Sequence, residues 1–460
     1  MRRKASGLAK QEPPGRLPAE LVEFLSRETY SLLIKGVSGT GKSILALTIL
    51  GKFKANENIL YLSTRTSPLQ LAKDHPWIAD VAGLSVEPSV GGTPEEGWET
   101  LVDARLDEPG VVFERITNVL MDKHAPTVVV DSWEALSESM DEEALRTNIR
   151  VLQTWRERAG ARLIFIGEDS ANTAIDSVVD GVVTLSERVF SGRRLREIFL
   201  SKLHGVKMPR PSYFFSLEGG VFHSFDRYSQ SGFGLAGQSP FREARIRGGD
   251  RRHHSTGFRP LDDALEGGYP SKSAAWIETD PRVDSRVVLA FLSGMIREWT
   301  ASGGSVVLQK SEGVDISSAT QLRALVGGDS NRFKVWETGS RGKKTRVDDI
   351  AGLRSKIAEA DRPILSIVDL DEFTHSGSST SADVLGSVVD FLKRSAELTI
   401  LVSRSRPAQH PFPAVVSTHI KILDIDGTLF LMSEKPWSEL YAMVPERPAG
   451  NASVQLERVV

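Results

Sequence analysis

Short apolar runs alternate with stretches of helical periodicity through the first half of the chain. The apolar runs, each typical of a buried strand, lie at 32–34, 58–62, 127–130 and 162–166. The helical patterns cover 44–50, 111–123 and 142–158. Strands and helices in alternation predict a parallel sheet with helices on both faces. Ligands of such sheets bind beyond the carboxyl ends of the strands, where chemistry is therefore expected.

Beyond Gly181 the pattern changes to short strands joined by turns, at 182–187, 195–203 and 213–217. We expect these strands to extend the sheet in antiparallel fashion. Their arginines form either a solvated hairpin or an interaction surface for a partner or nucleic acid; they are Arg188, Arg193, Arg194 and Arg196. Lys202 and His204 stand two residues apart, which places both on one side of a strand, where they would reach a γ-phosphate across a subunit boundary.

The chain is too long for one hydrophobic core, and its composition divides it into two halves. Residues 227–254 are rich in Ser, Gly, Gln and Arg and have no apolar period, which predicts a flexible basic linker. The expected parts are a flexible tail at 1–15, a first domain at 16–226, the linker, a second domain at 255–440 and a C-terminal tail at 441–460.

A complete phosphate-binding loop joins the first apolar run to the first helical pattern. Its residues are Gly36, Val37, Ser38, Gly39, Thr40, Gly41, Lys42 and Ser43, and Ile44 at the helix start is included among the expected nucleotide contacts. Spacing and context match G-x-x-x-x-G-K-[ST]. Glycines let backbone N–H groups converge at a helix N-terminus, which holds the β- and γ-phosphates of ATP. Lys42 adds a positive charge, and Ser43 adds a hydroxyl ligand for Mg²⁺. The alternative interpretation is a glycine-rich turn that contains a Lys-Ser pair by chance.

An acidic residue completes the expected nucleotide site. Asp131 directly follows the β-branched run at 127–130, which predicts a buried parallel strand. In P-loop NTPases an Asp at such a strand end orients the Mg²⁺, so Asp131 is the expected partner of Ser43. The alternative is an Asp that caps the strand end for structural reasons alone.

The second half repeats this plan but has lost the chemistry of the loop. An apolar strand at 274–277 leads through a turn into a helix at 287–299, and the apolar run at 364–368 ends in Asp369. In register with the first half, Thr279 stands opposite Gly36, Arg282 opposite Gly39, Asp284 opposite Gly41 and Ser285 opposite Lys42. Asp284 brings a carboxylate where phosphate would lie, so we expect no ATP binding in the second half.

Composition narrows the possible partners. The 460 residues are 40% hydrophobic and 25% charged, as in ordinary globular proteins, and a net charge of −3 does not favour nucleic acid as a partner. No apolar run approaches the roughly 20 residues that span a bilayer, so no membrane segment is expected. The basic, Pro-rich start lacks the apolar segment of a signal peptide. The absence of cysteine excludes disulfides and thiolate metal sites and is compatible with a cytoplasmic protein.

Three motifs together carry a family resemblance. They are the phosphate loop, the K-L-H-G element at 202–205 and the pattern S-T-G-x-x-x-L-D-x-x-L-x-G-G that opens the second half at 255. The chain resembles the RecA-like ATPases of the KaiC group, many of which carry two such domains in tandem. The resemblance implies an α/β fold of two tandem RecA-like P-loop NTPase domains, each a mostly parallel sheet with helices on both faces, the second degenerate.

Within that group the chain is most similar to the GvpD-type regulators of archaeal gas-vesicle genes. The similarity lies in the strand end at 60–65, in Asp74-His75-Pro76-Trp77 and in the degraded second half. It implies repression through a protein partner, a transcription activator, and dependence on arginine-rich regions, for which 188–196 and 242–252 are candidates. KaiC relatives form ring-shaped homo-oligomers in which Lys and Arg of a K-L-R-G element touch the neighbour's nucleotide. Here His204 replaces that Arg, which weakens such a contact and makes it pH-sensitive.

One departure from the family bears on mechanism. RecA-like ATPases of this group place catalytic carboxylates after the strand that follows the phosphate-loop helix, where this chain has Ser63, Thr64 and Arg65. Glu134 and Glu168 are candidate substitutes that would orient water beside Lys42 and Asp131; the alternative is that they are solvated or structural acids.

We therefore expect Mg-ATP binding with slow hydrolysis, the nucleotide acting as a switch for a protein partner. Two alternatives remain, a RecA-type DNA repair or recombination ATPase and a hexameric KaiC-like signalling ATPase. The first would need a basic, aromatic-bearing DNA channel, and the degenerate second loop argues against the second.

Overall fold

The computed structural model describes residues 15–53, 58–77, 101–138, 140–168, 174–229, 253–310, 332–337, 346–371, 381–404, 415–446 and 453–460. These residues form two compact units. The first unit ends at Asp226 and also includes Val459–Val460, and the second runs from Arg227 to Arg458.

The first unit is built on a mixed sheet whose strands follow the apolar runs of the sequence. Its strands are β1 (Tyr30–Gly36), β2 (Ile59–Ser63), β3 (Leu101–Asp103), β4 (Thr127–Asp131), β5 (Arg162–Ile166), β6 (Gly181–Phe190), β7 (Arg193–Leu203), β8 (Ser212–Ser216) and β9 (His223–Ser224). Among the described residues the order is β3-β2-β4-β5-β1-β6-β7-β8-β9. Pairing is parallel from β3 to β6 and antiparallel from β6 to β9, which confirms the predicted antiparallel extension.

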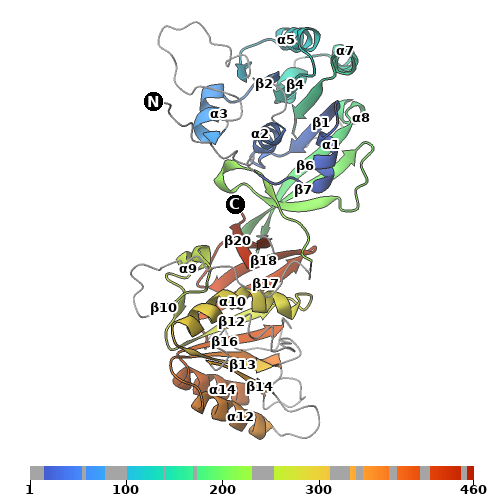
Figure 1. Cartoon of the computed structure of the whole chain (residues 1–460). Coiled ribbons are helices and arrows are strands. Elements are labelled where there is room, and N and C mark those ends of the chain that lie inside the picture. Colours follow the sequence, from blue (N-terminus) through green and yellow to red (C-terminus); the bar gives the residue numbers. More distant parts are fainter. Residues whose placement is uncertain are drawn as a thin grey trace, which may run out of the picture. The chain divides into compact units, whose positions relative to one another are not determined.

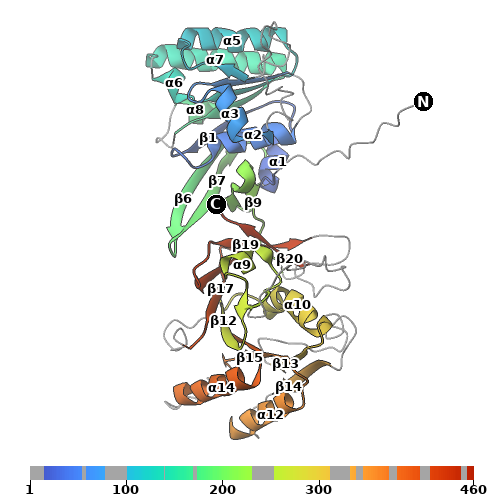
Figure 2. The same ribbon diagram turned by 90° about the vertical axis from the view of Figure 1, so that its left-hand side faces the viewer.

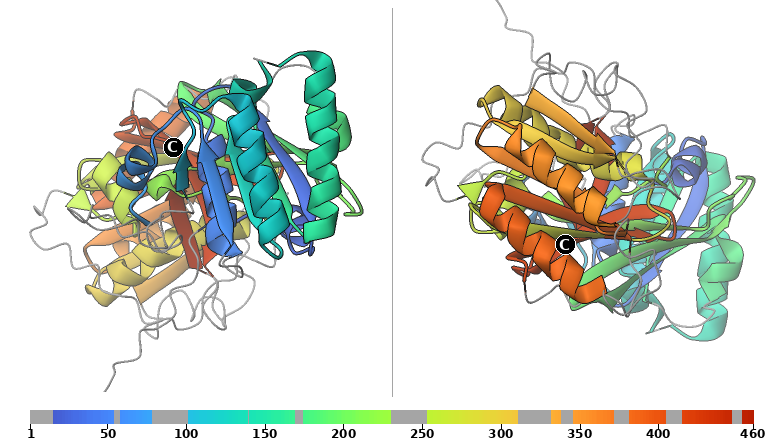
Figure 3. Two further views of the ribbon diagram at one scale, coloured as in Figure 1. Left: turned by 90° about the horizontal axis from the view of Figure 1, so that it is seen from above. Right: turned by 90° about the horizontal axis from the view of Figure 1, so that it is seen from below.

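Helices cover both faces of this sheet (Figure 1). One face carries α1 (Ala19–Leu25), α2 (Lys42–Lys52) and α3 (Pro68–Asp74), and the other carries α5 (Pro109–Asp122), α6 (Glu134–Ser137), α7 (Glu142–Ala159) and α8 (Ala174–Val178). Successive strand residues point to opposite faces, so Leu32 and Ile34 join the α2 core while Leu33 joins the α5–α7 core. Seen from above, α5 and α7 run side by side over their face (Figure 3).

The strands β6 and β7 are longer than the rest of this sheet. Only Gly181–Leu185 of β6 pairs with β1, and the remainder pairs with β7 alone. The two strands therefore continue as a hairpin beyond the body of the sheet (Figure 2). A short 3₁₀ helix, Glu218–Gly220, follows β8 and completes this side of the unit.

The second unit repeats the architecture of the first. Its main sheet contains β12 (Ser273–Thr279), β13 (Ser305–Lys310), β14 (Phe333–Glu337), β15 (Ile364–Asp369), β16 (Leu398–Arg404), β17 (Thr418–Ile425), β18 (Thr428–Lys435), β19 (Tyr441–Glu446) and β20 (Ser453–Arg458). In the described part of the chain the order is β14-β13-β15-β16-β12-β17-β18-β19-β20, which matches the first sheet strand for strand. The predicted tandem α/β fold is thereby confirmed, although the second loop has lost its motif.

Helices also cover both faces of the second sheet. α9 (Arg259–Ala264) and α10 (Ser285–Ala301) pack on one face, and α12 (Arg346–Ala358) and α14 (Ser381–Ser395) lie together on the other (Figure 3). No helix of the described residues is long and apolar enough to cross a membrane.

Two expectations about the ends of this unit are wrong. The predicted tail at 441–460 contains β19 and β20, because Met443, Val454 and Leu456 bury their side chains in the core. The predicted linker ends in a short strand, since β10 (His253–His254) pairs with β11 (Tyr269–Pro270). The expected tail before Gly15 and the arginines at 242–252 lie outside the described residues.

Candidate nucleotide-binding site

The phosphate loop lies between the end of β1 at Gly36 and the start of α2 at Lys42. Gly39 and Gly41 have φ angles of 85° and 98°, a region that side-chain-bearing residues rarely adopt. A Cβ on Gly41 would lie 2.6 Å from the Leu217 side chain, and a Cβ on Gly36 2.5 Å from a backbone oxygen of Leu185. The glycines are therefore required by backbone conformation and by close packing.

Lys42 turns back over the loop that precedes it. Its ammonium donates hydrogen bonds to the carbonyl oxygens of Gly36, at 2.6 Å, and Val37, at 3.0 Å. Burial lowers the pKa of Lys42, the nearby charge of Glu168 raises it again and that of Arg65 lowers it. These charges act on Lys42 because the ends of β1, β2 and β5 meet at one edge of the sheet.

Ser43 and Asp131 are in direct contact, as the sequence predicts for two groups that would share a Mg²⁺. The Ser43 hydroxyl donates a 2.7 Å hydrogen bond to Oδ2 of Asp131, at the end of β4. The same oxygen accepts a 2.6 Å hydrogen bond from the phenol of Tyr61, a buried residue of β2. One hydroxyl and one carboxylate, completed by phosphate oxygens and water, fit the ligands that Mg²⁺ prefers.

The structure also brings both candidate carboxylates to this edge. Oε1 of Glu134 accepts a 2.6 Å hydrogen bond from the backbone N–H of Glu168, and Oε2 of Glu134 is buried without a hydrogen-bond partner among the described residues. Glu168 pairs with Arg65 at 2.9 Å. Arg65 lies two residues past the end of β2. At this place the resemblance to RecA-like ATPases implies a catalytic carboxylate. The bend that holds it is fixed by Thr64, whose N–H donates to the carbonyl oxygen of Asp131 at 2.6 Å.

The arginines of the β6–β7 hairpin do not share one environment. Arg193 and Arg196 are each only 4% exposed, so the expectation of a wholly exposed basic cluster is wrong. Arg196 donates to the backbone oxygens of Gly39, at 3.1 Å, and Val460, at 2.8 Å, and pairs with Glu187 at 3.1 Å. Its position in an arginine-rich hairpin concealed this contact with the phosphate loop.

Lys202 and His204 lie away from the phosphate loop of their own unit. The Lys202 ammonium donates to the carbonyl oxygen of Val179 at 2.6 Å, beyond the end of α8. Val179 is next to Asp180, whose N–H donates to the carbonyl oxygen of Ser31 near the start of β1. The phosphate loop, in contrast, follows the other end of β1. His204 lies one residue past the end of β7, so the two side chains are not paired on one strand face as predicted.

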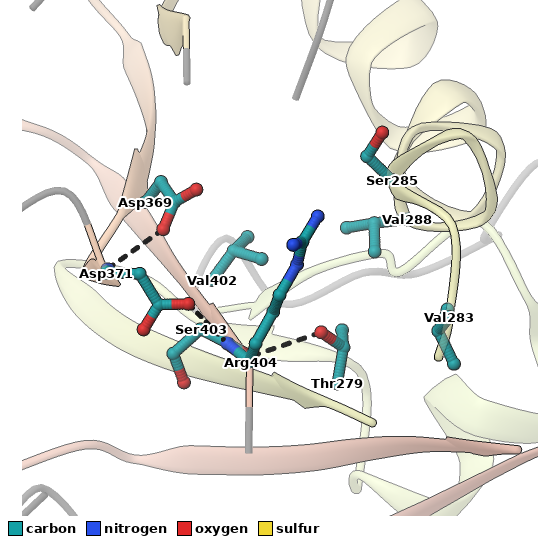
Figure 4. A pocket seen from close by; sticks show the side chains of 9 residues that line it. All are labelled: Thr279, Val283, Ser285, Val288, Asp369, Asp371, Val402, Ser403 and Arg404. Atoms are coloured by element: carbon teal, nitrogen blue, oxygen red, sulfur yellow. Dashed lines mark hydrogen bonds between the residues drawn. The ribbon is translucent and has the colours of Figure 1, made fainter. Parts of the chain in front are cut away.

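The corresponding turn of the second unit has a different chemistry. Asp284 is the N-cap of α10 and accepts a 2.8 Å hydrogen bond from the N–H of Arg286. Asp280 pairs with Arg282 at 3.0 Å within the same turn. A shallow pocket beside this turn contains the carboxylates of Asp369 and Asp371 and the Arg404 side chain, which extends towards α10 (Figure 4). The N-terminus of α10 is thus capped by the Asp284 carboxylate, whereas the N-cap of α2, Gly41, has no side chain that could cap it.

Comparison with known proteins agrees with this geometry. Residues 25–222 match the family model of the KaiC ATPase. The first unit is therefore similar to the KaiC ATPase over most of its length. In this KaiC-type unit, a complete phosphate loop at 36–43 stands beside a strand end at 63–65 that has no acidic residue.

The chain is also similar to two proteins of Halobacterium salinarum. It is 26% identical to Protein GvpD1 over 279 residues, which cover 57% of this chain but only half, 50%, of that protein. It is 22% identical to Protein GvpD2 over 493 aligned positions, which cover 96% of each chain. The similarity to GvpD2 therefore extends beyond the KaiC-type unit through the second unit.

Proposed function

We propose that the protein is a regulatory ATPase in which Mg-ATP at the loop Gly36–Ser43 switches the interaction with a protein partner. The observation that carries this proposal is the cluster of Lys42, Ser43 and Asp131 at the carboxyl edge of the KaiC-type sheet. In it, Lys42 and the loop N–H groups would hold the β- and γ-phosphates, while Ser43 and Asp131 would hold Mg²⁺. The metal would neutralise phosphate charge and orient the terminal phosphate.

Slow hydrolysis is part of the proposal. Its support is the absence of an acidic residue at the end of β2 and the engagement of both substitutes, Glu134 by the N–H of Glu168 and Glu168 by Arg65. A carboxylate oxygen that already accepts such a bond has less acceptor capacity left for a water. Glu134 is the better candidate, because one of its oxygens accepts no hydrogen bond among the described residues. Nucleotide would then set the conformation for many seconds.

The proposed partner rests on the similarity to the relatives. Similarity to GvpD proteins, which for GvpD2 covers both units, supports a regulatory role exerted through another protein, for which a transcription regulator is the proposed class. The exposed arginines of the hairpin, Arg188 and Arg194, offer a charged surface for it. A homo-oligomer and a cytoplasmic location complete the proposal.

Calorimetry with Mg-ATP tests nucleotide binding. We expect Lys42→Ala to abolish measurable binding and Lys52→Ala, at the other end of α2, to leave it unchanged. Because the second unit is expected to bind no ATP, Lys42→Ala should remove all binding from the full chain. Unchanged affinity in Lys42→Ala would refute the proposal.

A single-turnover assay tests the switch. We expect one bound ATP to be hydrolysed over minutes, and Glu134→Gln to slow that step further. Turnover of many ATP per second that Glu134→Gln abolishes would instead describe a motor. Salt-sensitive binding of single-stranded DNA that stimulates hydrolysis would favour a DNA repair ATPase.

A further inference from the structure

Arg65 occupies a position that the proposed function leaves unassigned. It lies two residues past the end of β2, whose last residue, Ser63, pairs in register with Asp131 of the neighbouring strand. Two further hydrogen bonds fix the backbone after β2. The N–H of Thr64 donates to the Asp131 carbonyl, and the Thr64 hydroxyl accepts from the N–H of Ser132 at 2.8 Å. The backbone that carries Arg65 is therefore tied to the strand that ends in the Mg²⁺-binding candidate.

The Arg65 side chain itself is less constrained than its backbone. Its guanidinium pairs with Glu168 at 2.9 Å, and both side chains are 47% exposed. A half-exposed ion pair contributes little stability and exchanges readily for a stronger partner. Both charges lie close enough to Lys42 to act on it electrostatically. Arg65 thus stands beside the ammonium that would bind the β- and γ-phosphates, held by a carboxylate that it can release.

Resting on the function proposed above, we propose that Arg65 binds the terminal phosphate of a nucleoside triphosphate and that Glu168 holds it when this phosphate is absent. A guanidinium recognises phosphate through paired, charge-assisted hydrogen bonds, as it does a carboxylate. The γ-phosphate and Glu168 then compete for one guanidinium. A diphosphate leaves Arg65 on Glu168, so the site distinguishes ATP from ADP by one exchange of partners.

This exchange also gives the switch a route into the protein. The N–H of Glu168 donates to Glu134, and Glu168 follows β5, whose next residue, Gly167, donates from its N–H to the Ile34 carbonyl of β1 at 2.8 Å. Release of Arg65 frees the Glu168 carboxylate at the end of β5. The state of the terminal phosphate is thus transmitted to the ends of β2, β5 and β1. This route needs no acidic residue at the end of β2.

The test compares the affinity of the full chain for ADP and for a non-hydrolysable ATP analogue, both with Mg²⁺, by calorimetry. We expect Arg65→Ala to weaken binding of the analogue roughly tenfold and to leave ADP within about twofold, because only the triphosphate reaches the guanidinium. Arg65→Lys should retain part of the preference. Glu168→Gln should strengthen the analogue more than ADP, since it removes the competing charge.

Arg105→Ala is the matched control. Arg105 also follows a strand of this sheet and pairs with a carboxylate, Asp103, at 2.7 Å, and its side chain is 45% exposed. Its removal should change neither affinity. If Arg65→Ala lowers the thermal stability, Arg65→Lys and Glu168→Gln still give the ratio of the two affinities.

The outcomes separate this inference from the proposed function. An Arg65→Ala variant that weakens ADP and the analogue equally, or neither, overturns the role of Arg65 while binding that depends on Lys42 persists. Nucleotide binding that does not change in Lys42→Ala overturns the nucleotide site itself, independently of the result for Arg65.

Discussion

The phenol of Tyr61 and the hydroxyl of Ser43 donate to the same oxygen, Oδ2 of Asp131, at 2.6 and 2.7 Å. Burial, and then the charge of Asp131, raise the pKa of Tyr61 well above its ordinary value, so the phenol keeps its proton and acts as a donor. Two donors from different elements, β2 and α2, thus set the orientation of one carboxylate. The candidate Mg²⁺ ligand is held in place before any metal arrives.

Removal of the Tyr61 hydroxyl tests this arrangement. Tyr61→Phe keeps the buried ring and deletes one hydrogen bond to a charged group, so we expect the free energy of unfolding to fall by about 1–2 kcal/mol. Nucleotide affinity should fall several-fold in the presence of Mg²⁺ and less in its absence, because the carboxylate loses its orientation. Urea denaturation and calorimetry measure the two effects.

Tyr441→Phe provides the comparison for that variant. Tyr441 is equally buried, but its hydroxyl donates to a neutral carbonyl, that of Pro260, at 3.2 Å in the second unit. We expect a smaller loss of stability and no change in nucleotide affinity. Equal effects of the two variants on affinity would show that Tyr61 acts through stability alone.

Gly41 combines a left-handed backbone conformation with close packing, because its φ is 98° and a Cβ added to it would lie 2.6 Å from the Leu217 side chain. Gly41→Ala should reduce nucleotide affinity more than tenfold, because the loop must shift to relieve both the strain and the contact. Gly192→Ala, at the hairpin turn, meets a φ of 75° but no neighbour within 4 Å. It should cost about 1 kcal/mol of stability and leave affinity unchanged, as thermal melts and calorimetry would show.

The positions of the strands along the chain and the phosphate loop follow from local patterns in the sequence. Apolar runs such as 127–130 carry the period of a buried strand, and the loop is a contiguous motif whose conformation depends on its own glycines. The second unit was predictable for the same reason, since its strands repeat those of the first even where its turn has changed. These features need no knowledge of distant contacts.

The residues that complete the site could not be read in this way. Tyr61 looks like any core aromatic residue until β2 is paired with β4, and Arg196 looks solvated until the hairpin folds towards Gly39. For Lys202 the motif suggests contact with a neighbouring subunit's nucleotide, which stays a prediction; within its own chain the ammonium bonds to the carbonyl of Val179. The prediction of a C-terminal tail at 441–460 was wrong, because β20 alternates apolar and polar residues over only a few positions. So short an alternation does not distinguish a strand from coil.

Asp180 should give the first unit a defined sensitivity to acid. Its carboxylate pairs with Arg156 and accepts two 2.8 Å hydrogen bonds from Ser31. Burial alone would raise the pKa of Asp180, but the bonds from Ser31 and the Arg156 charge outweigh it and hold the pKa below its ordinary value. The resulting stability is present above the unfolded pKa of about 3.9 and is lost as pH falls through the lower, folded pKa.

Asp180→Asn measures this contribution. At neutral pH the variant should unfold at lower urea concentration than the wild type, because the buried Arg156 loses one of its carboxylate partners and keeps only the exposed Glu157. The difference should shrink as pH drops below about 4, where the unfolded wild-type chain takes up a proton. A difference that stays constant down to strongly acidic pH would contradict the assigned ion pair.

Asp284 in the second unit should act as a helix cap and nothing more. Asp284→Ala removes the bond to the N–H of Arg286 and should cost about 1 kcal/mol, whereas Asp284→Asn should cost little. Neither variant should create nucleotide binding in a Lys42→Ala background, because the turn still lacks glycines and a lysine. Calorimetric heat from Mg-ATP in Lys42→Ala/Asp284→Ala would show that the carboxylate alone keeps ATP out.

Arg196 should affect all nucleotides alike, in contrast to Arg65. Its guanidinium contacts the backbone of the phosphate loop at Gly39 and of the chain end at Val460, so its role is to position the loop and not to touch phosphate. We expect Arg196→Ala to weaken ADP and the ATP analogue by the same factor, about threefold to tenfold, because each loses one preorganised loop. Arg194→Ala, which removes an exposed neighbour that also faces Glu187, should leave both affinities unchanged. A selective loss of the triphosphate in Arg196→Ala would instead assign phosphate contact to this arginine.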